Sequence, residues 1–401
     1  MKDVTSDWRG GAPFEPEDFT DQGFPVLHKG AIQKNGQVVI DPKKKTFTTE
    51  SFVQSHQKSV IDQSYTAVTL RDLVPSGPSI GLVADLAQSP GQQYILAQGA
   101  YGFRIDKKRL HPAYLVWLSN YEPFRLYMKR HAVGSTQIHI RTPAFQDLEI
   151  PLPPIDEQRR IAAILDRTDA VRRKRQEAIA LTEKLLRSAF LEMFGDPLIN
   201  SKGWTLNKLG NLTSKIGSGS TPRGGEASYK LSGIPLIRSM NVYNYSFAYT
   251  GLAYIDEKQA KALGHVTVTQ NDVLLNITGA SVARCTIVPP SLTPARVNQH
   301  VAILRTKADL INSVYLVSLI NSTTFKEKLL SLARSKGATR EALTKDELQN
   351  LTIPVPPLEI QEKFADIEEK IVSTLDQYSR TVQQSDNFFN SLIQRAFRGE
   401  L

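Results

Sequence analysis

The chain has 401 residues, a length that exceeds one ordinary core and predicts two to four folding units. Its residues are 41% hydrophobic and 22% charged, its net charge is +9, and no run approaches the ~18 consecutive apolar residues of a membrane span. The single cysteine, Cys285, excludes an intramolecular disulfide and argues against a cysteine-based zinc site. With a polar N-terminus that lacks the apolar stretch of a signal peptide, these features predict a cytoplasmic protein with no membrane partner.

The positive charge is concentrated in one part of the chain. Residues 197–358 contain 18 Lys and Arg against 9 Asp and Glu, so this segment carries an excess equal to the net charge of the whole chain. A basic segment of this kind favours an anionic partner, nucleic acid first, although a solvated basic domain has the same composition.

The sequence repeats itself at offsets of 201 to 210 residues. The paired segments are Gly10–Pro13 with Gly219–Pro222, Gly23–Val26 with Gly233–Leu236, Tyr114–Asn120 with Tyr315–Asn321, Gly134–Gln137 with Gly337–Arg340, and Ile150–Pro154 with Ile353–Pro357. Each pair alone means little, but their shared order indicates a duplication. The repeating unit is a globular domain, a proline-rich stop and a long helix.

Two long helices follow the proline pairs. Residues 157–194 contain neither Gly nor Pro, and the second helix runs from about Glu359 to Gly399. In the first, a seam of apolar or small residues recurs at spacings of three and four: Ile161, Ile164, Leu165, Thr168, Val171, Ala178, Leu181, Leu185, Ala189 and Met193. A helix of ~40 residues spans roughly 60 Å and needs a partner. The other helix is the expected partner in an antiparallel coiled coil; the alternative is that each helix packs on its own domain.

The globular parts are predicted to be α/β (α+β) domains with many short strands. Strands are expected at 235–237, 272–277 and 283–288, and helix from 312 to 332. Residues 242–249 are expected to form one strand, with their aromatic residues on one face. That face is either a platform for base stacking or a buried face of the sheet. The expected architecture is a pseudo-twofold repeat: recognition domains at 1–155 and 197–358, separated by antiparallel spacer helices at 156–196 and 359–401.

The sequence contains no recognisable catalytic motif. It lacks a Walker A motif, the Asn-Pro-Pro-aromatic motif of amino-methyltransferases, the His-Glu-x-x-His metal motif and a nucleophile elbow. We therefore expect a non-catalytic protein with no cofactor and no metal site.

Polar and basic residues in loops are the candidate DNA contacts. The glycine-rich loop 218–225 suits phosphate binding, although an ordinary flexible turn has the same composition. Arginine and asparagine near a strand end suit guanine and adenine edges, yet are also common on exposed strands. The candidates are Thr221, Arg223, Lys230, Arg238, Asn241, Asn244, Lys336, Thr339, Arg340, Lys29, Thr136 and Gln137.

The order of domain, Ile-Pro-x-Pro-Pro and long helix, twice over, resembles the specificity subunit of type I restriction–modification systems. The ending Gln394–Leu401 and the Glu157-Gln158 pair add to the resemblance, which covers nearly the whole chain. It implies two target recognition domains, each reading one half of a split site in double-stranded DNA. It also implies spacer helices that dock two S-adenosylmethionine-dependent modification subunits, with motor-nuclease restriction subunits joining for cleavage.

The first domain departs from this pattern. Only Met1 to Arg9 precede its glycine loop, which reads Gly-Gly-Ala-Pro, so this domain is expected to be shortened. Two other classes of function remain open: a non-catalytic two-domain adaptor that binds protein or RNA, and a self-contained nuclease or methyltransferase with an unrecognised site.

Overall fold

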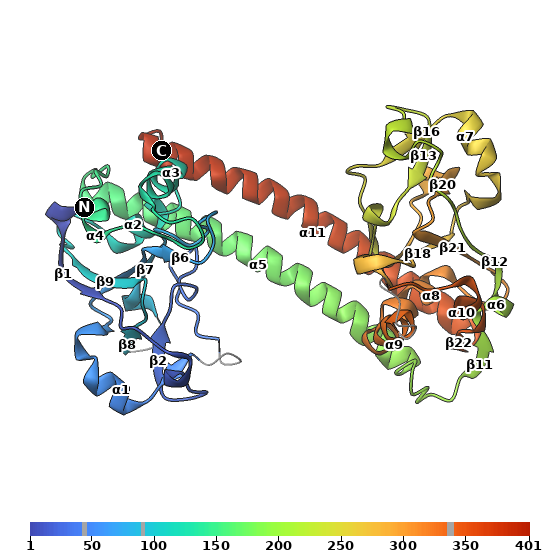
Figure 1. Ribbon diagram of the computed structural model, residues 1–401, viewed down its shortest axis with the longest axis horizontal. Coiled ribbons are helices and arrows are strands. Elements are labelled where there is room, and N and C mark those ends of the chain that lie inside the picture. Colours follow the sequence, from blue (N-terminus) through green and yellow to red (C-terminus); the bar gives the residue numbers. More distant parts are fainter. Residues whose placement is uncertain (42–45, 90–92, 335–340) are drawn as a thin grey trace. The chain divides into compact units, whose positions relative to one another are not determined.

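The computed structural model describes residues 1–41, 46–89, 93–334 and 341–401 and consists of two compact units. The first unit comprises Met1–Glu177 together with Ser379–Leu401, and the second comprises Ala178–Tyr378. Figure 1 labels the long helices and many of the other elements of each unit.

Two four-stranded sheets form the centre of the first unit. Its strands are β1 (Thr5–Gly10), β2 (Phe24–Leu27), β3 (Phe47–Thr48), β4 (Val60–Asp62), β5 (Thr66–Thr69), β6 (Arg71–Asp72), β7 (Val83–Asp85), β8 (Gln93–Leu96), β9 (Ala100–Ile105) and β10 (Ile138–His139). One sheet has the antiparallel order β1-β9-β5-β7, and the other has the order β3-β2-β8-β4 with β2 and β8 parallel. Strands β6 and β10 form a separate pair.

Short helices cover these sheets: α1 (Glu50–Ser55), α2 (Pro112–Leu118), α3 (Glu122–His131) and α4 (Thr142–Gln146). Every residue of α2 is buried, because the helix lies within the core rather than on its surface. Trp117 and Tyr114 of α2 are among the largest fully buried side chains of the chain.

The second unit repeats this plan. Its strands are β11 (Thr205–Lys208), β12 (Thr213–Ser218), β13 (Ile234–Ile237), β14 (Val242–Tyr243), β15 (Ser246–Phe247), β16 (Ala253–Ile255), β17 (Thr267–Val268), β18 (Val273–Asn276), β19 (Cys285–Ile287), β20 (Ala295–Val297), β21 (Val301–Thr306) and β22 (Thr352–Val355). Its sheets have the orders β12-β21-β18-β19 and β16-β13-β20-β17, with β13 and β20 parallel. Strand for strand, both orders match those of the first unit, so the duplication is a repeat of fold.

The helices of the second unit are α6 (Leu209–Leu212), α7 (Glu257–Ala262), α8 (Ser313–Asn321), α9 (Thr323–Arg334) and α10 (Lys345–Asn350). The strands expected at 235–237, 272–277 and 283–288 are present as β13, β18 and β19. The helix expected from 312 to 332 is instead two helices, because the backbone becomes extended at Ser322.

The two long helices are present at the expected places. Helix α5 spans Ile155–Phe194 and α11 spans Leu358–Arg398, and a glycine with positive φ follows each, Gly195 and Gly399. Asp156 and Glu359 lie in the first turns, where negative charge is favourable. Each helix begins in one unit and ends in the other.

A buried glutamine fixes the start of each long helix to its domain. The Gln158 amide accepts a hydrogen bond from the His111 backbone N–H at 2.9 Å and donates to the carbonyls of Arg109 and Pro153, both at 2.8 Å. Gln361 repeats the arrangement, accepting from the Asn312 N–H at 2.8 Å and donating to the Pro356 carbonyl at 2.7 Å.

The helices pack antiparallel within each unit. In the first unit, Arg172 of α5 forms an ion pair with Asp386 of α11 at 3.5 Å and lies over the ring of Phe389, 4.6 Å from its centroid. In the second unit, Phe190 and Phe194 of α5 contact Phe364 of α11, with ring centroids 5.6 and 5.3 Å apart.

The predicted apolar seam is only partly correct. Ile161 and Leu165 are buried as expected, but Leu181 is 66% exposed and Leu185 57% exposed. The buried residues of this part of α5 are Leu186, Phe190 and Phe194. The aromatic rings decide the buried face, because they pack against Tyr315 and Phe364 of the second unit's core.

Candidate nucleic-acid interface

A glycine loop lies against the end of the parallel strand pair in both units. A Cβ atom on Gly219 would stand 1.8 Å from the Val297 carbonyl oxygen, and one on Gly11 would stand 2.0 Å from that of Ala97. The loop backbone also donates to the adjoining strand: Gly219 N–H to the Asn298 carbonyl at 3.1 Å, and Ala12 N–H to the Leu96 carbonyl at 2.8 Å. Only glycine permits this approach.

In the second unit the loop meets a chain of hydrogen-bonded polar side chains. The Thr221 hydroxyl donates to Oε1 of Gln299, and Nε2 of Gln299 lies 3.1 Å from Nε2 of His300. Nδ1 of His300 lies 2.5 Å from the hydroxyl of Thr278. The chain therefore links the glycine loop to the residues that follow β18 and β20, and it brings Thr221 into a polar surface.

The first unit has a related surface at the same end of its sheets. Nη1 of Arg71 donates to Oε1 of Gln98 at 2.9 Å. Lys29 is half-buried. Burial is the larger cause that lowers the pKa of its ammonium group, and the positive charge of Arg71 is the second cause. Thr136 and Gln137 are exposed in the loop before β10.

Two of the expected base contacts are held by neighbouring loops of the second unit, Asn241 in the interior and Arg238 with a side chain that is 17% exposed. Asn241 is fully buried: its Oδ1 accepts from the Arg238 N–H at 3.0 Å and its Nδ2 donates to the Ala248 carbonyl at 2.9 Å. Arg238 donates to Glu226 at 2.6 Å and to the Gly251 carbonyl at 2.7 Å. The burial of Asn241 contradicts the expectation that it contacts a base directly. The base contact expected of Arg238 stays a prediction, and in this geometry its side chain holds the surrounding loops together.

The remaining candidates differ in how they are held. Arg223 is exposed and makes no hydrogen bond or ion pair with any residue that the structure describes. Lys230 forms an exposed ion pair with Asp256 at 3.6 Å, and the side-chain oxygen Oδ1 of Asn244 accepts from Lys326 at 3.0 Å. Lys336, Thr339 and Arg340 lie outside the described residues.

The aromatic segment 242–249 is a hairpin, so the prediction of a single strand is wrong. Strands β14 and β15 pair with each other, and Tyr245 takes a positive φ of 57° at the turn between them. Burial against the core raises the pKa of Tyr245 to about 12. Tyr243 is exposed beneath Arg284, whose guanidinium lies 4.7 Å from the ring centroid. The aromatic residues therefore do not form one stacking face.

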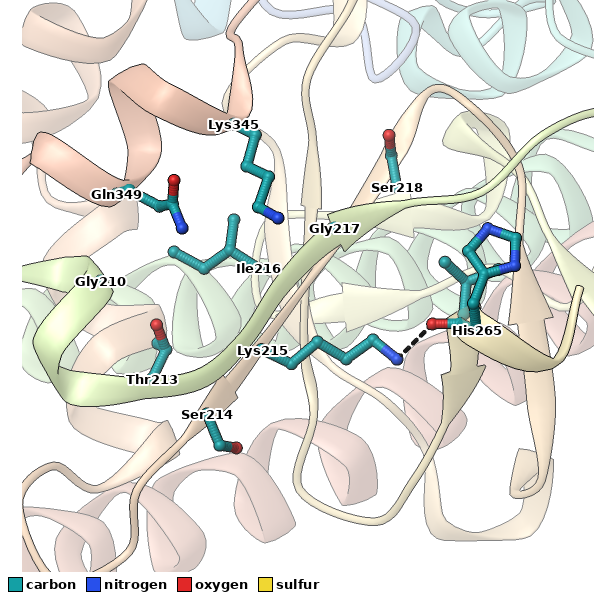
Figure 2. Close-up of a pocket in the computed structure, with 11 residues that line it drawn as sticks. Gly210, Thr213, Ser214, Lys215, Ile216, Gly217, Ser218, His265, Lys345 and Gln349 are labelled. Carbon is teal, nitrogen blue, oxygen red and sulfur yellow. Dashed lines mark hydrogen bonds between the residues drawn. The ribbon is translucent and has the colours of Figure 1, made fainter.

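A basic cavity of about 540 Å³ lies beside strand β12 in the second unit. Figure 2 shows Lys345 and Gln349 extending from α10 toward β12, and Lys215 reaching the carbonyl oxygen of His265. Burial, followed by the charge of Arg305, lowers the pKa of Lys215. Neither Lys215 nor Lys345 was predicted from the sequence, because isolated lysines carry no motif.

Other kinds of site are absent from the described part of the chain. Among these residues no three His, Cys, Asp or Glu side chains are placed to hold a metal ion. Cys285 is buried, and burial raises the pKa of its thiol. Within the same residues, no helix combines the length and apolarity needed to cross a membrane.

Comparison with known proteins identifies the family. The profile described as the type I restriction modification DNA specificity domain matches residues 2–181 and again residues 201–386. The chain belongs to the type I restriction–modification specificity family. The two matches correspond to the two copies of the repeat, and they support the resemblance drawn from the proline and glycine motifs.

Curated relatives agree with this assignment. The chain is 24% identical over 320 residues to the type I restriction enzyme MjaIX specificity subunit of Methanocaldococcus jannaschii, covering 75% of this chain and 72% of the relative. It is 24% identical over 293 residues to the EcoBI specificity subunit of Escherichia coli, covering 66% of this chain and 60% of that relative.

Solved structures share the fold. A type I restriction–modification S subunit from M. genitalium matches with a TM-score of 0.61 and 16% identity, covering 99% of this chain and 94% of that one. A chain from a structure of type I restriction–modification complex assembly matches with a TM-score of 0.55 and 20% identity, covering 100% and 97%.

Sequence reasoning missed the glutamines at the strand ends of this specificity subunit. Gln98 and Gln299 lie 201 residues apart, which is the offset of the Tyr114 and Tyr315 repeat. A residue-by-residue comparison at this offset would have found the pair. The sequence repeat pairs Gly10 with Gly219, which is an offset of 209. The strand pairing of β1 and β12 gives an offset of 208, so Gly11 is the structural equivalent of Gly219.

Proposed function

We propose that this specificity subunit reads a split site in double-stranded DNA, one half with residues 1–155 and the other with residues 197–358. The observation that carries the proposal is the repeat of one fold with the same glycine loop and polar strand end in each copy. The positive charge of residues 197–358 supports an anionic partner for that copy. The proposed contacts are Thr221, Arg223, Lys230, Arg238, Asn244, Lys29, Thr136 and Gln137, with Lys336, Thr339 and Arg340.

The basic cavity lined by Lys215 and Lys345, and the exposed Arg223, suit phosphate contacts rather than base contacts. Ammonium and guanidinium groups that neutralise phosphates release counterions, which makes binding dependent on salt but not on sequence. Arg223→Ala should therefore weaken binding to all sequences alike and reduce the salt slope by about one.

The spacer helices, residues 156–196 and 359–401, carry two modification subunits in this proposal. Each unit exposes large apolar side chains on them: Val171 and Phe388 in the first, and Leu181, Leu185 and Ile367 in the second. One apolar set for each unit fits two docked subunits. Those subunits would supply S-adenosylmethionine-dependent methylation, and motor-nuclease restriction subunits would join for cleavage, so the specificity subunit itself remains non-catalytic.

The experiment that tests this function maps the recognised site. The full chain is assembled with its modification subunits, and methylated sequences are selected from random duplex DNA. We expect a motif of two short halves separated by a non-specific gap, and no methylation or cleavage by the purified chain alone. A single undivided motif, or turnover by the chain alone, would contradict the proposal.

Two aromatic anchors make the gap testable. Phe194 packs on Tyr315 of the second unit and Phe397 packs on Tyr114 of the first, with ring centroids 4.8 and 5.2 Å apart. From Gln158 to Phe194 is 36 residues, and from Gln361 to Phe397 is also 36. The two helices thus have equal lengths between equivalent anchors, so a change of length in one helix tests whether the helices set the gap.

Duplicating Leu181 to Lys184 should lengthen α5 by ~6 Å. The four added residues turn the helix by about 400°, so the rest of the helix differs by only ~40° from its original orientation. Since stacked base pairs rise ~3.4 Å each, we expect a gap that is wider by about one or two base pairs, with both half-sites unchanged. Selection with the variant complex measures this. An unchanged gap would mean that the helices do not set the spacing.

A further inference from the structure

Gln299 projects from a tight link between two central strands of the second unit. The link connects β20 to β21, and it consists of Asn298, Gln299 and His300. Asn298 is buried, and its Oδ1 accepts from the His300 N–H at 3.0 Å, which holds the link closed. Gln299 is exposed. Its side chain therefore points away from a rigid support, beside the glycine loop that contains Thr221.

Gln98 occupies the equivalent position of the first unit. It lies between β8 and β9, flanked by Ala97 and by Gly99, both buried, and it is exposed. Gly99 has a φ of +96°, and a Cβ atom there would stand 2.6 Å from the side chain of Arg71. The link is thus closed by a glycine here and by an asparagine side chain in the second unit.

The difference between the two links isolates the glutamine. Ala-Gln-Gly and Asn-Gln-His share only the middle residue, although both join the same pair of strands. Both glutamines are exposed, and their partners within the fold differ, Thr221 in one unit and Arg71 in the other. No contact that the two units share therefore accounts for the shared glutamine.

The amide of each glutamine is oriented by a neighbouring donor. Oε1 of Gln299 accepts from the Thr221 hydroxyl, and Oε1 of Gln98 accepts from Arg71 at 2.9 Å. A carbonyl oxygen has two lone pairs and an amide nitrogen has two hydrogens. Arg71 can only donate, so it fixes the oxygen side of the Gln98 amide, while Thr221 and Nε2 of His300 hold the two sides of the Gln299 amide. In each unit the amide keeps a free acceptor position and a free donor position.

An oriented primary amide matches the edge of adenine. In the major groove adenine presents the N6 amino donor and the N7 acceptor, which a glutamine amide contacts with two hydrogen bonds. We propose that Gln98 and Gln299 are specificity-determining residues, each reading one adenine in the half-site of its own unit. Arg71 and Thr221 are positioning residues that fix the amides. This inference rests on the proposed function.

The test is site selection with four variants of the full chain, assembled with its modification subunits. The variants are Gln299→Ala, Gln299→Glu, Gln98→Ala and the control Gln270→Ala. Gln270 is an exposed amide in the turn before β18, whereas Thr278 of the polar chain follows that strand. Thermal unfolding of each variant checks that the fold is kept.

Gln299→Ala should lower discrimination at one A·T pair of one half-site by about 5- to 150-fold, the equivalent of a lost two-bond contact. Gln98→Ala should do the same in the other half, and Gln270→Ala should change nothing. Gln299→Glu should shift the preference at the affected position from adenine toward cytosine, because a carboxylate accepts from the cytosine N4 amino group.

Two results would overturn the inference. Equal weakening for all sequences would make the glutamines backbone contacts, and unchanged motifs would remove them from the interface. Both results leave the proposed function standing, provided that the wild-type complex selects a split motif. A wild-type complex that selects no split motif contradicts the proposed function itself. Thr221→Ala adds a further readout, a smaller loss of discrimination at the same base pair as Gln299→Ala.

Discussion

The two units keep the same strand order but support the same arginine in different ways. Arg305 of β21 and Arg104 of β9 are equivalent, because their strands pair in matching register. Arg305 binds the fully buried carboxylate of Asp272 through two nitrogens, at 2.8 and 2.7 Å. At the position of Asp272 the first unit has Tyr65, and Arg104 lies over its ring, 4.9 Å from the centroid.

This difference shows that the repeat preserves backbone pairing more strictly than electrostatics. In the first unit Arg104 has its acidic partner in Asp7, at 3.3 Å, and both side chains are about half exposed. Water screens such a pair, whereas the carboxylate of Asp272 depends on its protein partners. At these equivalent positions the second unit therefore has an ion pair with a buried carboxylate, whereas the pair in the first unit is half exposed.

The largest expected effect separates the units at this point. Asp272→Asn should destabilise the second unit by about 3–5 kcal/mol, because Arg305 loses its charged partner and the buried amide fits the Thr269 and Arg305 donors poorly. Asp7→Asn in the first unit should cost less than about 1 kcal/mol. Urea unfolding of the full-length variants measures both. Equal losses would show that the two arginines are supported equally.

A smaller effect concerns a feature that the units share. Gln158→Ala should cost about 2–3 kcal/mol, because it leaves one buried N–H and two carbonyls without partners. Gln361→Ala removes two such hydrogen bonds and should cost somewhat less. The unfolding midpoint in urea ranks the two. The exposed Gln137→Ala is the control, and a loss there as large as in Gln158→Ala would contradict the argument.

Sequence patterns predicted the elements whose cause is local. Proline pairs and the lack of Gly and Pro in 157–194 defined α5 and α11, because proline and glycine act on the backbone next to them. The alternation of aromatic residues at 242–249 led to the wrong prediction of a single strand. Tyr245 takes the positive φ of a turn, and nothing in the sequence distinguishes it from a strand residue. Likewise, the exposed Leu181 and Leu185 continue the apolar period, but the aromatic partners on other elements decide which face is buried.

The candidate site was predictable in place but not in detail. The glycine loops and the polar loop at Thr136 and Gln137 were found from composition and repeat order. Arg238 and Asn241 have the right chemistry for bases, yet their partners Glu226 and Ala248 lie in separate loops. Which polar side chains satisfy one another is set by tertiary contacts, which spacing along the chain does not contain.

The smallest effect compares one position in the two long helices. Glu368 of α11 is equivalent to Leu165 of α5, since each lies seven residues after its anchoring glutamine. Leu165 is fully buried in the first unit's core. Burial, followed by the charge of Glu369, raises the pKa of Glu368 to about 6 from its ordinary value of 4.5. At this position the second helix therefore has a carboxylate whose charged form is disfavoured by burial, and the first helix has an apolar side chain.

The sign of the pH dependence is set by this raised pKa. The folded state holds the proton more tightly than the unfolded state, so the second unit loses stability as the pH rises from 4.5 through 6. Well below pH 4.5 both states are protonated and the penalty is absent. Glu368→Gln should thus stabilise the second unit by about 1–2 kcal/mol at pH 7 and by almost nothing at about pH 3.5. Urea unfolding of the wild type and the variant across this range measures the difference. A stabilisation that is the same at both pH values would show that the charge of Glu368 is not its cause, and Glu362→Gln serves as the exposed control on the same helix.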